Sequence, residues 1–251
     1  MASPEGFAET ADVETASEDY ARRFAGTVGE WFLERQASSV RELLAGLPRG
    51  ARVLDVGGGH AQLVPALVDA GYEVLVVGSD ESCAARLAPW LADGRCRFEV
   101  ANVVALPYAA QTFDGVVSVR LLSHVTAWRE LVREICRVAA RCVVVDYPSS
   151  RSVNAFSEAL FAAKKRVERN TRPFRLFHPQ DVRAAFGGEG FRVKESRPQF
   201  LWPMVLHRML GRAALGRVLE APGRVSGVLR IFGSPVIVRA DRLIDSPRDA
   251  R

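Results

Sequence analysis

The chain has 251 residues, of which 48% are hydrophobic and 25% charged, and its formal net charge is +5 at pH 7. This average globular composition excludes a disordered chain, a collagen-like repeat and a disulfide-dense scaffold. The length suits one large α/β domain with additions. No apolar run is long enough to span a bilayer, and the N-terminus has no apolar signal segment, so we expect a cytoplasmic protein without a transmembrane helix.

The cysteines and the charge distribution narrow the class of protein further. The four cysteines form no C-x-x-C pair and lack clustered histidines, so we expect neither a zinc site nor a redox motif. Residues 1–150 carry 14 basic and 20 acidic side chains, whereas residues 151–251 carry 20 basic and 9 acidic ones. A basic C-terminal part is compatible with nucleic acid, an anionic membrane surface or an anionic small molecule.

Hydrophobic periodicity indicates the order of the elements along the chain. We expect a flexible acidic terminus over residues 1–17, and two helices between residues 18 and 47. Short β-rich runs then alternate with helical stretches, which predicts a doubly wound, mainly parallel sheet. The expected strands are 52–56, 73–77, 96–100, 115–119, 142–146, 191–195 and 235–240, and the expected helices are about 62–70, 82–91, 128–138, 152–169 and 178–186.

The segment Asp55-Val56-Gly57-Gly58-Gly59 holds the strongest chemical signal. A strand that ends in an acid and runs through glycines into a helix lets the backbone approach a ligand at the carboxyl edge of the sheet. A nicotinamide fingerprint is excluded because Gln62 stands where its third glycine belongs, and a P-loop is excluded because no Gly-Lys-Ser/Thr follows.

With four downstream blocks, this segment resembles the class I S-adenosylmethionine-dependent methyltransferases from about residue 20 to residue 240. The blocks are Val76-Val77-Gly78-Ser79-Asp80, residues 102–108 with Thr112-Phe113-Asp114, residues 120–125, and Arg137-Val138. The resemblance implies a Rossmann-like fold with seven strands, N-terminal helices and an inserted helical lid. It therefore implies a single domain over residues 18–251, with substrate-side insertions at about 151–177 and 199–233.

The same resemblance assigns the cofactor S-adenosyl-L-methionine to a set of residues. Asp80 would accept bonds from the ribose hydroxyls, Asp55 would hold the ammonium, and Asn102 stands where the family usually has an aspartate for the adenine. The full expected cofactor-binding set is Asp55, Gly57, Gly58, Gly59, Asp80, Glu81, Asn102, Val103, Arg120, Leu121 and Tyr20.

His124 is the candidate general base, because it follows the fourth strand at the edge where the acceptor would lie. A structural role at a helix start is the alternative for this histidine, and His60, His178 and His207 are placed less favourably. No metal is expected.

The insertions bear on the acceptor. The second one is rich in Leu, Met and aromatic residues, which suits a hydrophobic small molecule that can carry an anionic group, although the same residues could complete the core or touch a membrane surface. We therefore expect methyl transfer to oxygen or carbon of such a metabolite, in small-molecule biosynthesis. An RNA methyltransferase is one alternative, although the sequence lacks the motifs of nucleic-acid enzymes; a non-catalytic cofactor-binding protein is the other. The oligomeric state stays open.

Overall fold

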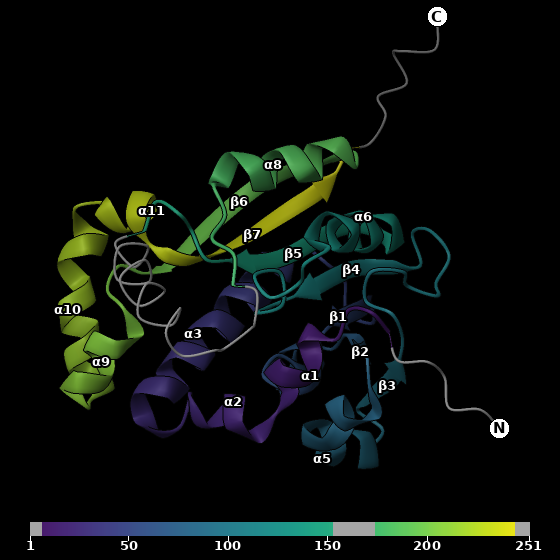
Figure 1. Ribbon diagram of the computed structural model, residues 1–251, viewed down its shortest axis with the longest axis horizontal. Coiled ribbons are helices and arrows are strands. Elements are labelled where there is room, and N and C mark those ends of the chain that lie inside the picture. The colour runs from purple at the N-terminus through teal and green to yellow at the C-terminus, as the bar shows by residue number, and fades with distance from the viewer. Residues whose placement is uncertain (1–6, 153–173, 244–251) are drawn as a thin grey trace, which may run out of the picture.

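The computed structural model describes residues 7–152 and 174–243, and its centre is a seven-stranded sheet in the order β3-β2-β1-β4-β5-β7-β6 (Figure 1). The first five strands run parallel, and β6 and β7 pair antiparallel at one edge. The strands are β1 (Arg52–Val56), β2 (Glu73–Gly78), β3 (Cys96–Val100), β4 (Phe113–Ser118), β5 (Ala139–Tyr147), β6 (Phe191–Phe200) and β7 (Ser234–Arg242). The expected doubly wound, mainly parallel sheet is thereby confirmed.

Helices cover both faces of this sheet, because successive strand residues point to opposite sides. On one face, Leu54 and Val56 of β1 pack with α6 (Trp128–Val138) and α8 (Pro179–Gly188). On the other face, Val53 packs with α3 (Gly26–Leu44) and α4 (Val64–Asp69). The remaining helices of the described residues are α1 (Ala11–Ala16), α2 (Glu18–Arg22), η1 (Gly58–His60), η2 (Glu81–Leu87), α5 (Ala88–Ala92), α9 (Met204–Leu210), α10 (Ala213–Val225) and α11 (Val228–Phe232).

Several boundaries differ from the expected ones. The helix expected over 82–91 divides into η2 and α5, with Pro89 in the first turn of α5, where a missing N–H does no harm. The strand expected over 191–195 continues to residue 200, because β6 pairs with β7 along nearly its full length. Residues 11–16, expected in a flexible terminus, form α1, since Asp12 and Ala16 find buried positions against η1 and η2.

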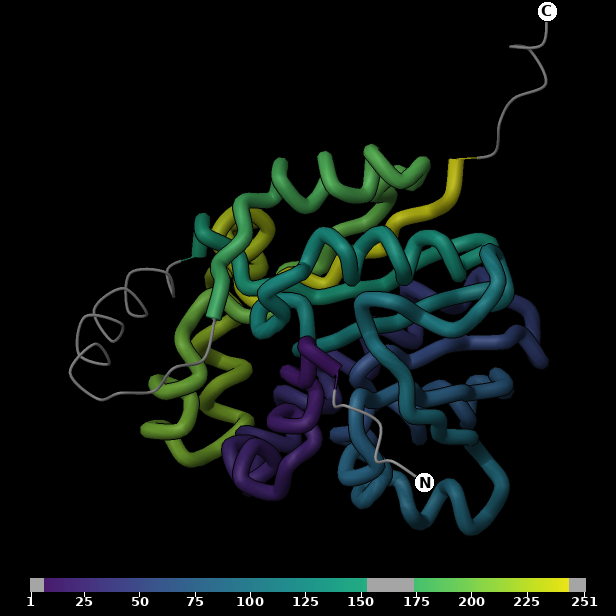
Figure 2. Tube along the Cα trace, turned by 45° about the vertical axis from the view of Figure 1, so that its right-hand side comes forward, coloured from purple at the N-terminus to yellow at the C-terminus, as the bar shows by residue number. Residues whose placement is uncertain are grey.

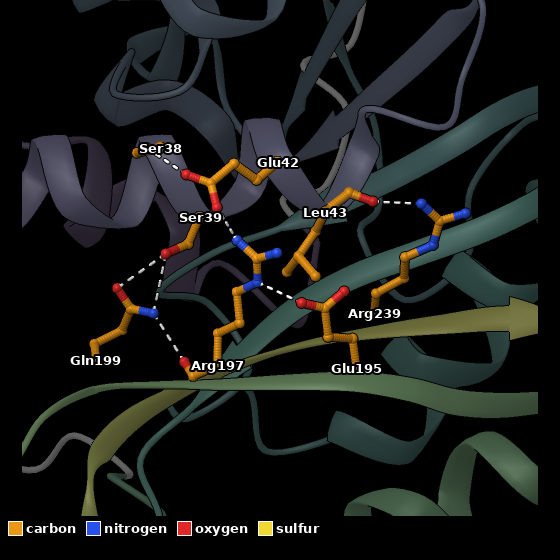
Figure 3. Close-up of polar contacts among 8 residues, drawn as sticks. All are labelled: Ser38, Ser39, Glu42, Leu43, Glu195, Arg197, Gln199 and Arg239. Carbon is orange, nitrogen blue, oxygen red and sulfur yellow. Dashed lines mark hydrogen bonds and ion pairs between the residues drawn. The ribbon is translucent and has the colours of Figure 1, made fainter. Parts of the chain in front are cut away.

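Polar side chains fasten α3 to the antiparallel edge of the sheet (Figure 3). Arg197 of β6 binds Glu42 of α3 and also Glu195 on its own strand. Gln199 exchanges hydrogen bonds with Ser39, and the Arg239 guanidinium donates to a backbone carbonyl of α3. These contacts hold α3 in place beneath the sheet edge.

The second expected insertion, 199–233, contains α9, α10 and α11, which lie together at one end of the molecule (Figure 1). A buried hydrogen bond joins α9 to α10: His207 Nε2 lies 2.9 Å from Glu220 Oε1. Glu220 also accepts the backbone N–H groups of Leu201 and Trp202. Of the helix expected at 152–169, all but residue 152 lies outside the described residues. Among the residues described, no helix has the length and apolarity needed to cross a membrane.

Candidate functional site

The candidate site lies at the carboxyl edge of the sheet, where β1, β2 and β4 end side by side. Directly after β1, Gly57 adopts a left-handed conformation with φ of 75°. A Cβ atom at this position would lie 2.7 Å from Leu121 Cδ2, so a larger residue would collide with the loop after β4 as well as strain the backbone. The absence of a side chain at Gly57 thus allows the backbone of this turn to lie directly against the loop after β4.

Several buried polar atoms around this turn have no hydrogen-bond partner in the described part of the chain. They are Asp55 Oδ2 on β1, both ring nitrogens of His60 on η1, and Nε and Nη1 of Arg120 just after β4. An unsatisfied buried polar atom costs free energy, and natural structures retain few of them. Their gathering at one strand edge therefore indicates a place where a polar ligand binds.

The electrostatics of these groups suit a ligand that carries both charges. Burial raises the pKa of Asp55 to about 7, although the Arg120 guanidinium opposes the shift. Burial, followed by the positive charges of Arg120 and Arg86, lowers the pKa of His60 to about 3, so this imidazole is neutral. A ligand cation beside Asp55 and a ligand anion beside Arg120 would relieve both desolvated groups.

A carboxylate at the end of β5 orients Arg120. Asp146 Oδ1 accepts the Arg120 backbone N–H at 2.6 Å, and Asp146 Oδ2 accepts Gln36 Nε2 of α3 at 3.3 Å. The Arg120 backbone has a φ of 62°, which a non-glycine residue adopts only under tertiary constraint. Burial raises the pKa of Asp146 to about 6, opposed chiefly by this backbone hydrogen bond.

Helix α1 packs into the edge between β1 and β2. The Asp12 carboxylate is 1% exposed and accepts both the backbone N–H of Ser79, at 2.6 Å, and its hydroxyl, at 2.5 Å. A Cβ atom added to Gly57 would lie 3.5 Å from the Cβ of Asp12, and one added to Gly59 would lie 2.9 Å from the Cβ of Ala16. Residues of α1 therefore fill the space between the glycine turn and the end of β2.

The two acids expected at the end of β2 lie on the outer side of this contact. Asp80 is exposed and caps η2, where its carboxylate accepts the Ser82 N–H at 2.8 Å, and this hydrogen bonding lowers its pKa. Glu81 follows it as an exposed residue of η2. The strand itself ends at Gly78, so the carboxylate that sits buried at the strand end is Asp12, not Asp80.

The residues expected near the adenine lie after two strands, Asn102 and Val103 after β3 and Leu121 after β4. Asn102 Oδ1 accepts the Val104 N–H at 3.1 Å, which holds the loop that follows the strand. Val103 and Leu121 are fully buried in the core beneath the edge. The structure thus brings Asn102, Val103 and Leu121 to the same side of the sheet as Asp55 and the glycine turn.

The Tyr20 ring of α2 lies near both His60, at the expected cofactor site, and His124, the expected base. Its ring centroid lies 6.0 Å from that of His60 and 6.5 Å from that of His124, and Arg120 Cζ lies 5.6 Å from it. Tyr20 and His124 both line a cleft of about 710 Å³ that also includes Arg23. The expected base and the expected aromatic residue therefore face one cleft.

The other histidines have structural surroundings. His178 caps α8 through its ring nitrogen, and His207 is buried in the pair with Glu220. The sequence reasoning did not select Asp12, Gln36 or Asp146. Only Asp146 carried a usable signal, because it is an acid at the end of a predicted parallel strand.

Comparison with known proteins relates this site to a described protein family. Residues 54–141 match a protein-family model described as the methyltransferase domain, Methyltransf_11. No curated protein matches the chain. The matched stretch begins on β1 and extends into β5, so it contains the glycine turn, the β2 end and the loop after β4.

Solved structures share the fold at low sequence identity. Magnesium protoporphyrin IX methyltransferase from Synechocystis PCC 6803 with bound SAH has a TM-score of 0.64 at 16% identity, covering 89% of this chain and 93% of that one. The Burkholderia thailandensis 1,6-didemethyltoxoflavin-N1-methyltransferase with bound 1,6-didemethyltoxoflavin and S-adenosylhomocysteine has a TM-score of 0.56 at 18% identity, covering 84% and 79%. The 4+2 cyclase SpnF has a TM-score of 0.57 at 16% identity, covering 82% and 80%.

Proposed function

Because the chain contains a class I, S-adenosylmethionine-dependent methyltransferase domain, we propose that it transfers a methyl group to an oxygen or carbon atom of a hydrophobic small molecule. One observation carries the cofactor assignment for this chain's own residues. Unpartnered polar atoms of Asp55, His60 and Arg120 surround a glycine turn that has no room for a Cβ atom. This donor and acceptor set fits the amino-acid end of the cofactor, which carries an ammonium and a carboxylate.

The proposed roles follow from those positions. When bound, S-adenosylmethionine supplies an activated methyl group. Asp55 accepts hydrogen bonds from the cofactor ammonium, while Arg120 and the backbone of residues 57–59 meet its carboxylate. Asp80 and Glu81 hold the ribose, and Asn102, Val103 and Leu121 hold the adenine. Binding at the ribose end requires α1 to move, because Asp12 now lies against Ser79.

The acceptor is assigned to the cleft beside Tyr20 and His124. Its tyrosine ring offers apolar area for a hydrophobic acceptor, whereas Arg23 pairs with Glu14, one of three carboxylates in the lining, so the charge of the cleft does not favour an anionic acceptor. His124 takes the proton from a hydroxyl or enol acceptor before or during methyl transfer. We also propose a cytoplasmic location and a single domain over residues 18–251.

Two measurements test this function in sequence. Calorimetry with S-adenosylhomocysteine should show binding to the wild-type protein and at least tenfold weaker binding to Arg120→Gln, while exchange of the exposed Arg133 for Gln should leave the affinity unchanged. Turnover is then measured with methyl-labelled S-adenosylmethionine on a panel of phenols, enols and carboxylic acids. Transfer of label to RNA alone, or tight binding with no turnover on any acceptor, would contradict the proposal and favour an RNA enzyme or a binding protein respectively.

The role of His124 is tested separately, once an acceptor is known. The exchange His124→Asn should lower kcat and remove the acidic limb of the pH profile, whereas the affinity for S-adenosylhomocysteine should not change. A profile of unchanged shape would show that His124 only positions the loop after β4.

A further inference from the structure

The most unusual surface of the molecule belongs to α10, whose outward face is apolar. Its buried side consists of Gly216, Glu220 and Gly223, which pack toward α9, α3 and the end of β6. The opposite side of the same helix carries Leu215, Val218, Pro222 and Val225, at the spacing of three and four residues that marks one helical stripe. Val218 is 70% and Val225 is 90% exposed. An ordinary surface helix shows the reverse arrangement.

The neighbouring helices also expose apolar residues. In α9, Met209 is 80% exposed, and Val205 and Leu210 are exposed beside it. In α11, Ile231 and Phe232 are exposed. Figure 2 shows α9, α10 and α11 together at the side of the molecule away from the parallel strands. Scattered apolar residues are normal on protein surfaces, but the concentration of exposed apolar residues on three adjoining helices indicates a contact with something apolar.

The charges on the same helices have a single sign. Residues 203–233 contain five arginines, all exposed, at positions 208, 212, 217, 224 and 230. The one acid in that stretch, Glu220, is fully buried and bound to His207, so it does not offset them at the surface. Arg217 and Arg224 flank the apolar stripe of α10 on the side next to Val218 and Val225. The surface therefore combines exposed apolar side chains with exposed arginines, of which Arg230 alone lines a cleft that also contains Glu34 and Glu42 of α3.

We propose that this surface, formed by α9, α10 and α11, docks the protein on anionic lipid bilayers. Apolar side chains on a basic amphipathic helix enter the headgroup boundary while arginines meet lipid phosphates and carboxylates. A second copy of the chain fits the surface poorly, because a symmetric contact would place the arginines of both copies against each other without a facing carboxylate. The side chains also protrude instead of lining a groove, which suits insertion between lipids more than recognition of one protein partner.

The experiment uses the full chain and vesicle cosedimentation, and it does not depend on the methyltransferase assignment. Vesicles of phosphatidylcholine with 30% phosphatidylserine are compared with pure phosphatidylcholine. Wild-type protein should bind the anionic vesicles and release as salt is raised from about 0.1 to 0.5 M, because screening weakens the arginine contacts. The double exchange Arg208→Gln with Arg224→Gln should lower partitioning about 30-fold, from the attraction of about 1 kcal/mol that each basic residue contributes near such a surface.

Apolar and control variants separate the contributions. The double exchange Val218→Ser with Val225→Ser should lower binding at least tenfold at any salt concentration, because the insertion term does not depend on charge. Exchange of Arg133 and Arg192 for Gln removes the same charge from exposed sites on α6 and β6, and should change binding less than threefold. Melting curves confirm that every variant is folded.

Three results would overturn the proposal. One is wild-type protein that does not bind anionic vesicles better than neutral ones, which would mean that the exposed apolar side chains and arginines do not produce membrane binding. Another is an equal loss of binding in the Arg133 and Arg192 control, which would reduce the effect to net charge. The third is a stable dimer in sedimentation that Val218→Ser with Val225→Ser dissociates, which would assign the face to a second copy.

Discussion

The contact between Asp12 and Ser79 should control how tightly the cofactor binds. Asp12 lies where the ribose end of the cofactor is proposed to sit, between the glycine turn and the end of β2. Because α1 and the ligand need the same space, the affinity measured for the ligand is reduced by the fraction of molecules in which α1 is displaced. The exchange Asp12→Ala removes the carboxylate that holds α1 there and should tighten binding.

The size of the effect follows from the two hydrogen bonds. Each bond from Ser79 to the Asp12 carboxylate, at 2.6 and 2.5 Å, contributes about 1.5–3 kcal/mol because the acceptor is charged. Desolvation of the carboxylate offsets part of the sum, so we take the lower end, about 3 kcal/mol. A docking free energy of that size leaves about 0.6% of molecules open and weakens the apparent affinity roughly 150-fold. Because the packing of Ala16 still holds α1 to some extent in the Asp12→Ala protein, we expect its affinity for the ligand to increase by about 10- to 100-fold, less than the full factor.

Calorimetry with S-adenosylhomocysteine measures this difference directly, and hydrogen exchange at the Ser79 amide reports whether α1 is docked. Asp19→Asn is the matched control, since Asp19 is an exposed carboxylate of the neighbouring α2. The control should bind like wild type and keep the Ser79 amide protected. An Asp12→Ala protein that binds S-adenosylhomocysteine no better than wild type, or more weakly, would refute the competition and make Asp12 a contributor to the ligand site.

Three further outcomes are expected. Gly57→Ala should lower the free energy of unfolding, measured in urea titrations, by about 2–4 kcal/mol, because alanine is strained in the left-handed conformation and its Cβ atom would contact Leu121. The same exchange should weaken the binding of S-adenosylhomocysteine at least tenfold. Wild-type values for stability and affinity would show that the turn tolerates a Cβ atom. Burial raises the pKa of Asp55 to about 7, and pairing with the ligand ammonium needs the ionised carboxylate, so the affinity for S-adenosylhomocysteine should rise about tenfold per pH unit up to about pH 7 and then level off. Asp55→Asn should flatten this pH dependence. A wild-type affinity that does not change with pH would exclude the pairing. Glu220→Ala should lower the stability measured in thermal or urea unfolding by about 3–5 kcal/mol, because it leaves two backbone N–H groups and His207 without their partner. Glu220→Gln should cost less. Equal stability of the wild-type protein and both variants would contradict a role of Glu220 in holding α9 to α10.

The sequence by itself determined the parallel core of this protein. Strands 52–56 and 96–100 and helix 128–138 have the predicted bounds, because their apolar residues follow the period of buried strands and of an amphipathic helix. The glycine turn after Asp55 was also legible, since its function depends on residues that are adjacent in the chain. Short-range pattern is sufficient for such features.

Only the tertiary structure decided how distant residues meet at the site. The contact of Asp12 with Ser79 spans 67 positions, and that of Gln36 with Asp146 spans 110. A buried carboxylate and a solvent-exposed one look the same in a sequence, so the composition of residues 1–17 suggested a flexible terminus, whereas burial against η1 and η2 stabilises α1. The outward apolar stripe of α10 was hidden for the same reason. Helical periodicity shows that a helix has an apolar face, but only the packing of its neighbours decides whether that face meets the core or the solvent.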